Sequence, residues 1–138
     1  MIIGMGTDIV EIERIAAMIE RHGDLFVDRI FTPAESAYCG SKKHAAQHFA
    51  GRWAAKEAAM KAIGTGFIPG IRWHDFEVLP ALSGAPQLTL TGGAAERATA
   101  LGIAQMLVTM SHCRSYATAT VIGVSTPPSA LTAPPDKN

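Results

Sequence analysis

The sequence predicts a single domain of the α+β class, on three observations. The chain has 138 residues with 48% hydrophobic side chains, which is typical of a globular protein rather than a disordered one. Helical and strand-like patterns are mixed along the chain without an internal repeat. Near the C-terminal end, two strand-like runs are separated by three residues, which indicates an antiparallel hairpin.

A strand and a helix are predicted first. Residues 2–10, IIGMGTDIV, form a short apolar run rich in Ile and Val that predicts a buried strand. Gly4 and Gly6 within it are typical of a close backbone approach or a bulge. Residues 11–22 carry apolar side chains at helical spacing, and Gly23 provides a stop signal.

A second helix start is marked by Thr32 as the N-cap, with Pro33 at the first helical position and Glu35 three residues after the cap. The basic, polar segment GSKKH then leads to a long helix, predicted over residues 45–63.

The second half is predicted to contain four strands and one helix. Turn residues separate the first two strands, and glycines bound the helix. The predicted strands cover residues 71–80, 86–91, 104–112 and 116–124, and the helix covers residues 92–102. The domain therefore spans residues 1–124, and the Pro-rich tail, residues 125–138, is expected to be disordered.

Charge and cysteine content exclude several classes of function. Twelve basic and twelve acidic residues give no net charge, which argues against bulk binding to nucleic acid or an anionic membrane. The only cysteines, Cys39 and Cys113, lack the spacing of a disulfide framework or a zinc site. There is no signal peptide and no apolar run long enough to cross a bilayer, so we expect a cytoplasmic protein.

Asp8 stands in an apolar stretch, where an ionised carboxylate is costly unless it is paired or binds a metal. It could instead cap the helix that follows. On the long helix, Arg52 and Lys56 share one face, and Glu57 and Lys61 share another. These charges form either a solvated flank or a site in which one carboxylate holds a divalent cation and three cations hold phosphates.

Two further segments each leave two interpretations open. The triplet Gly64–Gly66 is either a helix C-cap with a turn or a place where backbone N–H groups approach a phosphate. His112, at the end of a predicted strand, is either a structural residue or a contact for a phosphate or a substrate amide. Ser111 cannot pair with it as a nucleophile, because neighbouring strand residues point to opposite faces.

Three motifs together match a known family in order and spacing: GMGTDIVEIERI, FAGRWAAKEAAMKAIGTG and SHCRSYATATVI. With these motifs and the connecting segments WHDFEVLP and GAPQLTLTG, the chain resembles holo-acyl-carrier-protein synthase, the small bacterial type of 4′-phosphopantetheinyl transferase. The resemblance covers residues 1 to about 124. It implies a long helix packed with a small, mainly antiparallel sheet, and a homotrimer with active sites between protomers.

The resemblance also implies an activity. The family transfers phosphopantetheine from coenzyme A to a serine hydroxyl of an acidic acyl carrier protein, with adenosine 3′,5′-bisphosphate as by-product, Mg²⁺ as cofactor and a role in fatty acid biosynthesis. By motif position, Asp8 and Glu57 would be the metal ligands and, with Lys61, the catalytic residues. The coenzyme A site would comprise Arg52, Lys56, Lys61, Gly64, Thr65, Gly66 and His112.

The residues are chemically compatible with this role. Mg²⁺ commonly takes one or two carboxylates together with substrate phosphates. Positioning and charge stabilisation carry most of phosphoryl transfer, here through the metal and Lys61. Arg52 and Lys56 suit a further terminal phosphate, such as the 3′-phosphate. We hypothesise that Glu57, or a metal-bound water that it orients, removes the serine proton.

The first predicted helix offers a docking surface for the carrier protein. Arg14 and Arg21 lie two turns apart with Met18 between them, which would suit an acidic helical partner. Without the resemblance, an ordinary amphipathic helix with an exposed basic edge would be the preferred explanation of these residues.

Two positions depart from the family pattern. Val10 stands where larger, single-chain relatives have a second acidic residue, so water would replace that metal ligand. Cys113 follows His112 where many relatives have a polar or acidic residue. A non-catalytic module that binds a nucleotide or a carrier protein is the alternative function, but a lapsed enzyme should have lost Asp8, Glu57 or Lys61, and all three are present.

Overall fold

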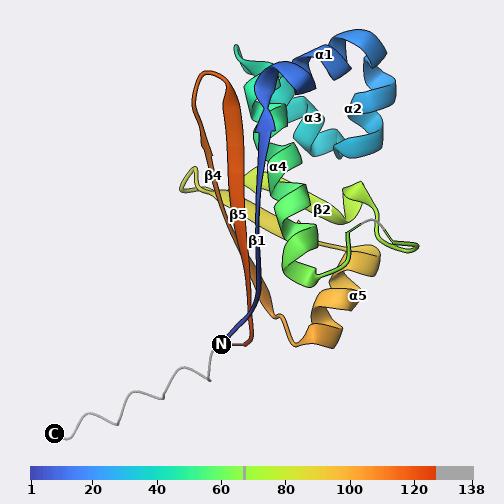
Figure 1. The fold of residues 1–138 in the computed structure, drawn as a ribbon, viewed down its shortest axis with the longest axis vertical. Coiled ribbons are helices and arrows are strands. Elements are labelled where there is room, and N and C mark those ends of the chain that lie inside the picture. Colours follow the sequence, from blue (N-terminus) through green and yellow to red (C-terminus); the bar gives the residue numbers. More distant parts are fainter. Residues whose placement is uncertain (67, 127–138) are drawn as a thin grey trace, which may run out of the picture.

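The computed structural model describes residues 1–66 and 68–126, and these form an α+β fold with two antiparallel sheets (Figure 1). The larger sheet has the strand order β1-β5-β4, and the smaller pairs β2 with β3. The strands are β1 (Ile2–Glu11), β2 (Phe76–Pro80), β3 (Pro86–Leu90), β4 (Gln105–His112) and β5 (Tyr116–Val124). The predicted C-terminal hairpin is confirmed, with β4 and β5 paired along their whole length.

The described residues form five α-helices besides the sheets. They are α1 (Ile12–His22), α2 (Asp24–Ile30), α3 (Pro33–Gly40), α4 (Ala45–Ile63) and α5 (Gly92–Leu101). The predicted bounds of the long helix are those observed for α4. Helix α2 was not predicted; this short helix follows the positive-φ Gly23 and buries Phe26 and Ile30.

The predicted strand over residues 71–80 is too long, because its first part forms the 3-10 helix η1 (Trp73–Asp75). The capping box of α3 is confirmed. Thr32 Oγ1 accepts a hydrogen bond from Glu35 N at 3.2 Å, and Glu35 Oε1 accepts one from Thr32 N at 2.9 Å. The interpretation of Asp8 as a helix cap is wrong, because Asp8 lies within β1 and Glu11 occupies the N-cap of α1.

Helix α4 packs against the inner face of the larger sheet, and two glycines allow β1 to approach it closely. A Cβ atom added at Gly4 would overlap Ala62 O, and one added at Gly6 would overlap Ala58 O. The predicted close backbone approach is therefore confirmed. Because strand residues alternate between faces, Asp8 points to the same side as these glycines, toward α4.

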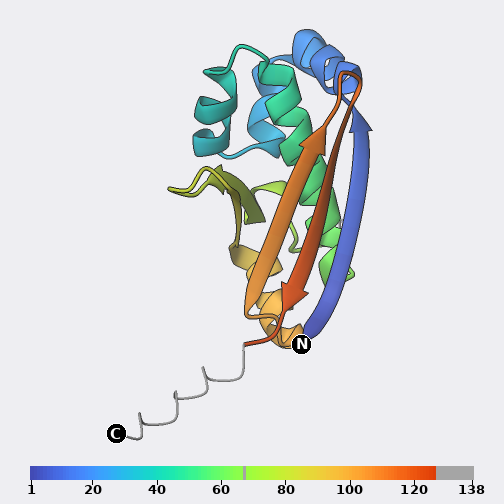
Figure 2. The same ribbon diagram turned by 90° about the vertical axis from the view of Figure 1, so that its left-hand side faces the viewer.

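The outer face of the larger sheet is not covered by any described helix, since all of them lie on the other side (Figure 2). We call it the open sheet face. Its exposed large apolar side chains are Ile3, Met5, Ile9, Leu107 and Tyr116. An exposed apolar patch of this kind typically marks an interaction site.

No helix among the described residues is both long and apolar enough to span a membrane. The prediction of a disordered tail concerns mainly residues 127–138, which lie outside the described residues.

Candidate functional site

The first group of predicted site residues lies where β1 meets the C-terminal half of α4. The Asp8 side chain is 17% exposed, and Lys61 Nζ lies 3.4 Å from Asp8 Oδ1. Lys61 Nζ also donates to Thr7 O at 2.9 Å, which ties the lysine to the strand that carries the aspartate. Lys61 remains 56% exposed, so its ammonium is accessible to a ligand beside Asp8.

Glu57 belongs to the same group. Partial burial raises the pKa of its carboxyl, the negative charge of Asp8 raises it further, and the charges of Lys61 and Arg14 oppose the shift. The two carboxylates therefore repel each other, and a divalent cation between them would relieve that repulsion. Oxygen donors of this kind suit Mg²⁺. No cluster of three or more metal-ligating side chains is found among the described residues, so the chain would supply these two.

A second group lies at the other end of α4 and includes Arg52 and His112. Arg52 Nε donates to Val78 O at 3.1 Å and Nη1 to His48 O at 3.3 Å, while its guanidinium stacks 4.6 Å from the centre of the Tyr38 ring. Arg52 lines a pocket together with His112 from β4, Gly84 from the loop between β2 and β3, and the prolines at the adjoining ends of these two strands.

Two histidines, His48 and His112, also line this pocket. His112 Nε2 lies 2.9 Å from Gln47 Nε2, an interaction that sequence reasoning did not anticipate. Burial lowers the pKa of His48, and the nearby charge of Arg52 lowers it further. An anionic group is the ligand that this electrostatic environment favours.

The two groups lie on opposite flanks of α4. Residues 52 and 61 are nine positions apart, and at about 100° per residue their side chains point in opposite directions. The strand order also separates the two groups, because Asp8 is on β1 at one edge of the larger sheet and His112 is on β4 at the other. One chain thus presents two half-sites rather than one continuous site.

The burial of Lys56 contradicts the prediction that this residue contacts a phosphate of coenzyme A. Its side chain is fully buried and forms an ion pair with Glu35, with Nζ 2.7 Å from Oε1. Nζ also donates to Trp73 O and Phe76 O. An ammonium group has three hydrogens, and all three have acceptors within the protein. Glu35, which the sequence showed only as a capping residue, is the partner that was missed.

The Gly64–Gly66 segment ends α4 with a left-handed Gly64 at φ 73°. The C-cap interpretation is thus confirmed, and Arg97 Nε supports the same helix end by donating to Ile63 O at 3.2 Å. The Thr65 hydroxyl is buried and has no hydrogen-bond partner among the described residues. Contact of this segment with a phosphate stays a prediction.

The predicted docking residues lie on α1. Arg14 and Arg21 are exposed, while Met18 is partly buried and packs against the core. The Arg14 guanidinium lies 5.9 Å from the centre of the Trp53 ring, and its charge acts on Glu57. The basic edge of α1 therefore adjoins the group of Asp8, Glu57 and Lys61.

Comparison with known proteins identifies the family. The family model of the 4′-phosphopantetheinyl transferase superfamily matches residues 4–121. A holo-[acyl-carrier-protein] synthase from Koribacter versatilis is 53% identical over 122 residues, which cover 88% of this chain and 98% of that protein.

Solved structures agree. A holo-[acyl-carrier-protein] synthase from Neisseria meningitidis superposes with a TM-score of 0.83 at 30% identity, covering 91% of this chain and 100% of that one. The Helicobacter pylori enzyme in complex with coenzyme A gives a TM-score of 0.77 at 29% identity, covering 87% and 99%. The chain therefore belongs to the 4′-phosphopantetheinyl transferase superfamily, among the holo-[acyl-carrier-protein] synthases.

Proposed function

We propose that this protein transfers 4′-phosphopantetheine from coenzyme A to a serine hydroxyl of apo acyl carrier protein and releases adenosine 3′,5′-bisphosphate. The observation that carries the proposal is the group of Asp8, Glu57 and Lys61 between β1 and α4, in a chain with the family's fold. A relative from Helicobacter pylori was solved in complex with coenzyme A, which supports the choice of donor substrate.

In this reaction the serine oxygen forms a bond to the β-phosphorus of coenzyme A, and the bond from that phosphorus to the bridging oxygen breaks. Lys61, held beside Asp8, stabilises negative charge on the phosphates. Asp8 and Glu57 would hold Mg²⁺, which when bound neutralises charge on the pyrophosphate. Glu57, or a water that it orients, is proposed to accept the serine proton.

The active enzyme is proposed to be a homotrimer. The open sheet face exposes Met5 by 65% and Ile9 by 64%, and an exposed apolar patch of this kind typically marks an interaction site. The half-site with Arg52 and His112 lies on the flank of α4 opposite to the half-site with Asp8. A neighbouring copy that covers the open sheet face could supply one half-site to the other, so that a single coenzyme A spans both.

The basic edge of α1 is proposed to dock the acidic carrier protein through Arg14, Met18 and Arg21. This location suits the chemistry, because Arg14 is close enough to influence the charge of Glu57. The acceptor serine would thus arrive next to the carboxylates and Lys61. Both cysteines are free thiols in the structure, in keeping with a cytoplasmic enzyme of fatty acid biosynthesis.

Intact-mass spectrometry of apo acyl carrier protein tests the proposal. After incubation with this protein, coenzyme A and Mg²⁺, the carrier should gain the mass of one phosphopantetheine. EDTA and Asp8→Ala should each abolish the gain, whereas Glu96→Ala, at an exposed carboxylate on α5, should leave it unchanged.

An unmodified carrier would refute transfer, provided that another transferase modifies the same preparation. Binding of coenzyme A or carrier protein without transfer would then favour the non-catalytic module.

A further inference from the structure

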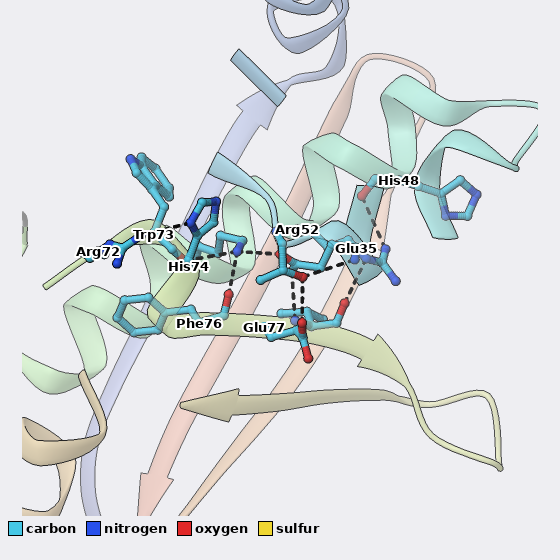
Figure 3. Close-up of polar contacts among 11 residues, drawn as sticks. Glu35, His48, Arg52, Arg72, Trp73, His74, Phe76 and Glu77 are labelled. Atoms are coloured by element: carbon cyan, nitrogen blue, oxygen red, sulfur yellow. Dashed lines mark hydrogen bonds and ion pairs between the residues drawn. The ribbon is translucent and has the colours of Figure 1, made fainter. Parts of the chain in front are cut away.

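Charged side chains, rather than a third strand, hold the outer edge of β2. One edge of β2 pairs with β3, and the other faces α3 and α4. On that second edge, Lys56 Nζ donates to Phe76 O at 2.5 Å and Arg52 Nε donates to Val78 O at 3.1 Å. Val78 N donates to Glu35 Oε2 at 2.9 Å. Figure 3 shows Glu35 and Arg52 converging on this edge.

The spacing of helix and strand explains why two basic residues fit. Arg52 and Lys56 are one turn apart on α4, a rise of about 6 Å. Phe76 and Val78 are two residues apart on β2, a distance of about 6.7 Å, and their carbonyls point to the same edge. Each basic side chain therefore meets one outward carbonyl.

Glu35 connects the two basic residues through Val78. Its Oε1 accepts from Lys56 Nζ and from Thr32 N, and its Oε2 accepts from Val78 N. Val78 is thus fixed at its N–H by Glu35, while its carbonyl receives Arg52. Both Glu35 and Lys56 are fully buried, so water does not compete for these contacts.

Arg52 is the member of this network that reaches the pocket beside His112. Its Nε and Nη1 atoms donate to backbone carbonyls. Nη2 makes no hydrogen bond with any residue that the structure describes, which leaves its hydrogens for a ligand in the pocket.

We propose that Glu35 is a positioning residue: it fixes the Val78 N–H at the edge of β2, so that the Val78 carbonyl orients the Arg52 guanidinium for binding a terminal phosphate, while Lys56 balances the buried charge of Glu35. This inference rests on the proposed function, in which Arg52 contacts the 3′-phosphate of coenzyme A. It assigns to Lys56 an indirect role in place of the direct phosphate contact that the sequence suggested.

Stability alone does not account for the buried pair. Desolvation of two charges typically cancels their attraction, and apolar pairs of similar volume often stabilise a protein equally well. Burial lowers the pKa of Lys56, and the Glu35 carboxylate opposes that shift. What an apolar pair cannot supply is an acceptor for Val78 N and a donor for Phe76 O.

Two matched double variants separate positioning from packing. Glu35→Leu/Lys56→Met removes the charges and the acceptor for Val78 N, whereas Glu35→Gln/Lys56→Met removes the charges but keeps an acceptor. Calorimetric titration with adenosine 3′,5′-bisphosphate and adenosine 5′-monophosphate measures how strongly each protein prefers the second phosphate. Arg52→Met serves as the reference without the guanidinium.

We expect the unmodified protein to prefer the bisphosphate. The leucine-containing variant should lose about tenfold or more of this preference, the range of a hydrogen bond to a charged group, and should bind the monophosphate as before. The glutamine-containing variant should keep most of the preference.

Each other outcome has a distinct meaning. Equal affinities of the unmodified protein for the two nucleotides would overturn the phosphate role of Arg52, and this inference with it. The unmodified protein could instead prefer the bisphosphate while the two double variants behave alike, both keeping this preference or both losing it equally. That result would overturn only the positioning role.

If the leucine-containing variant does not fold, amide hydrogen exchange of the unmodified protein answers the same question. The bisphosphate should slow exchange at Val78 N more than the monophosphate does. Identical protection by the two nucleotides would overturn the inference.

Discussion

Replacement of Gly6 by alanine should disturb the fold and the proposed catalytic group together. Gly6 faces α4 from β1, two residues before Asp8. A Cβ atom added there would lie 2.7 Å from Lys61 Cβ and 2.9 Å from Ala62 N, and would overlap Ala58 O. Two of these three obstacles are helix backbone, which cannot rotate away as a side chain can.

The size of the effect follows from this overlap. Carbon atoms in contact normally lie about 3.5–4.0 Å apart, so β1 must move away from α4 by roughly 1 Å. Overpacking of this kind costs about 1–3 kcal/mol, occasionally more, and the entropy that alanine removes from the unfolded chain returns about 0.5 kcal/mol. We expect a net loss of about 2 kcal/mol, equivalent to a fall in Tm of about 7 °C for a chain of this size.

The same displacement should slow the reaction, because Asp8 would move away from Glu57 and Lys61. A misplacement of about 1 Å can reduce turnover by up to about 100-fold. Thermal unfolding at fixed protein concentration and the rate of carrier modification measure the two effects. Gly40→Ala is the matched control, since a Cβ there meets no atom within 4 Å and should leave both quantities nearly unchanged. A Gly6→Ala protein that unfolds within about 1 °C of the unmodified one would refute the reasoning.

Three further predictions concern single side chains. Lys56→Met should lower the free energy of unfolding by about 3–5 kcal/mol because it leaves the Glu35 charge buried and unpaired, and Glu35→Gln/Lys56→Met should recover part of it in urea titrations, since the neutral amide keeps an acceptor for Val78 N. Arg14→Glu should raise the KM for carrier protein about tenfold without changing the KM for coenzyme A, and equal changes in both would remove its docking role. Iodoacetamide at pH 8 should modify Cys113 and spare Cys39 until urea is added, as read by mass spectrometry. Burial raises the pKa of Cys39 to about 11, so its reactive thiolate is scarce below that pH, whereas backbone hydrogen bonds lower the pKa of the exposed Cys113.

The fold was largely predictable because most of its elements carry local signals. The capping box at Thr32, the glycines that end the first and long helices, and the short turn of the C-terminal hairpin all depend on near neighbours in sequence. Helix α2 has no such signal. Seven residues are too few to show a helical period, and packing of Phe26 against Trp53 and Phe31, rather than helix propensity, favours this segment.

The candidate site was predictable only in part, because helical periodicity shows which residues of α4 share a face but not what that face meets. Arg52 and Lys56 were correctly placed together, yet the β2 carbonyls to which they donate lie 26 and 20 residues later in the chain. The ion pair of Lys56 with Glu35 joins residues 21 positions apart, and no local pattern records it. Lys56 was therefore predicted to contact a phosphate, although its burial prevents that contact.

The different environments of the charges on α4 suggest how one helix serves two purposes. Lys61 is exposed beside Asp8, where a ligand can reach it. Lys56 is buried, and its ammonium group donates all three of its hydrogens to acceptors within the protein. Arg52 is also largely buried, with an exposed fraction of 4%, but its guanidinium lies at the wall of a pocket, where backbone carbonyls hold it. A charge that must meet a phosphate needs both access and a fixed direction. The arginine obtains its direction from the Val78 carbonyl, fixed by the glutamate that the buried lysine pairs with, and the exposed lysine obtains its own from the backbone of β1.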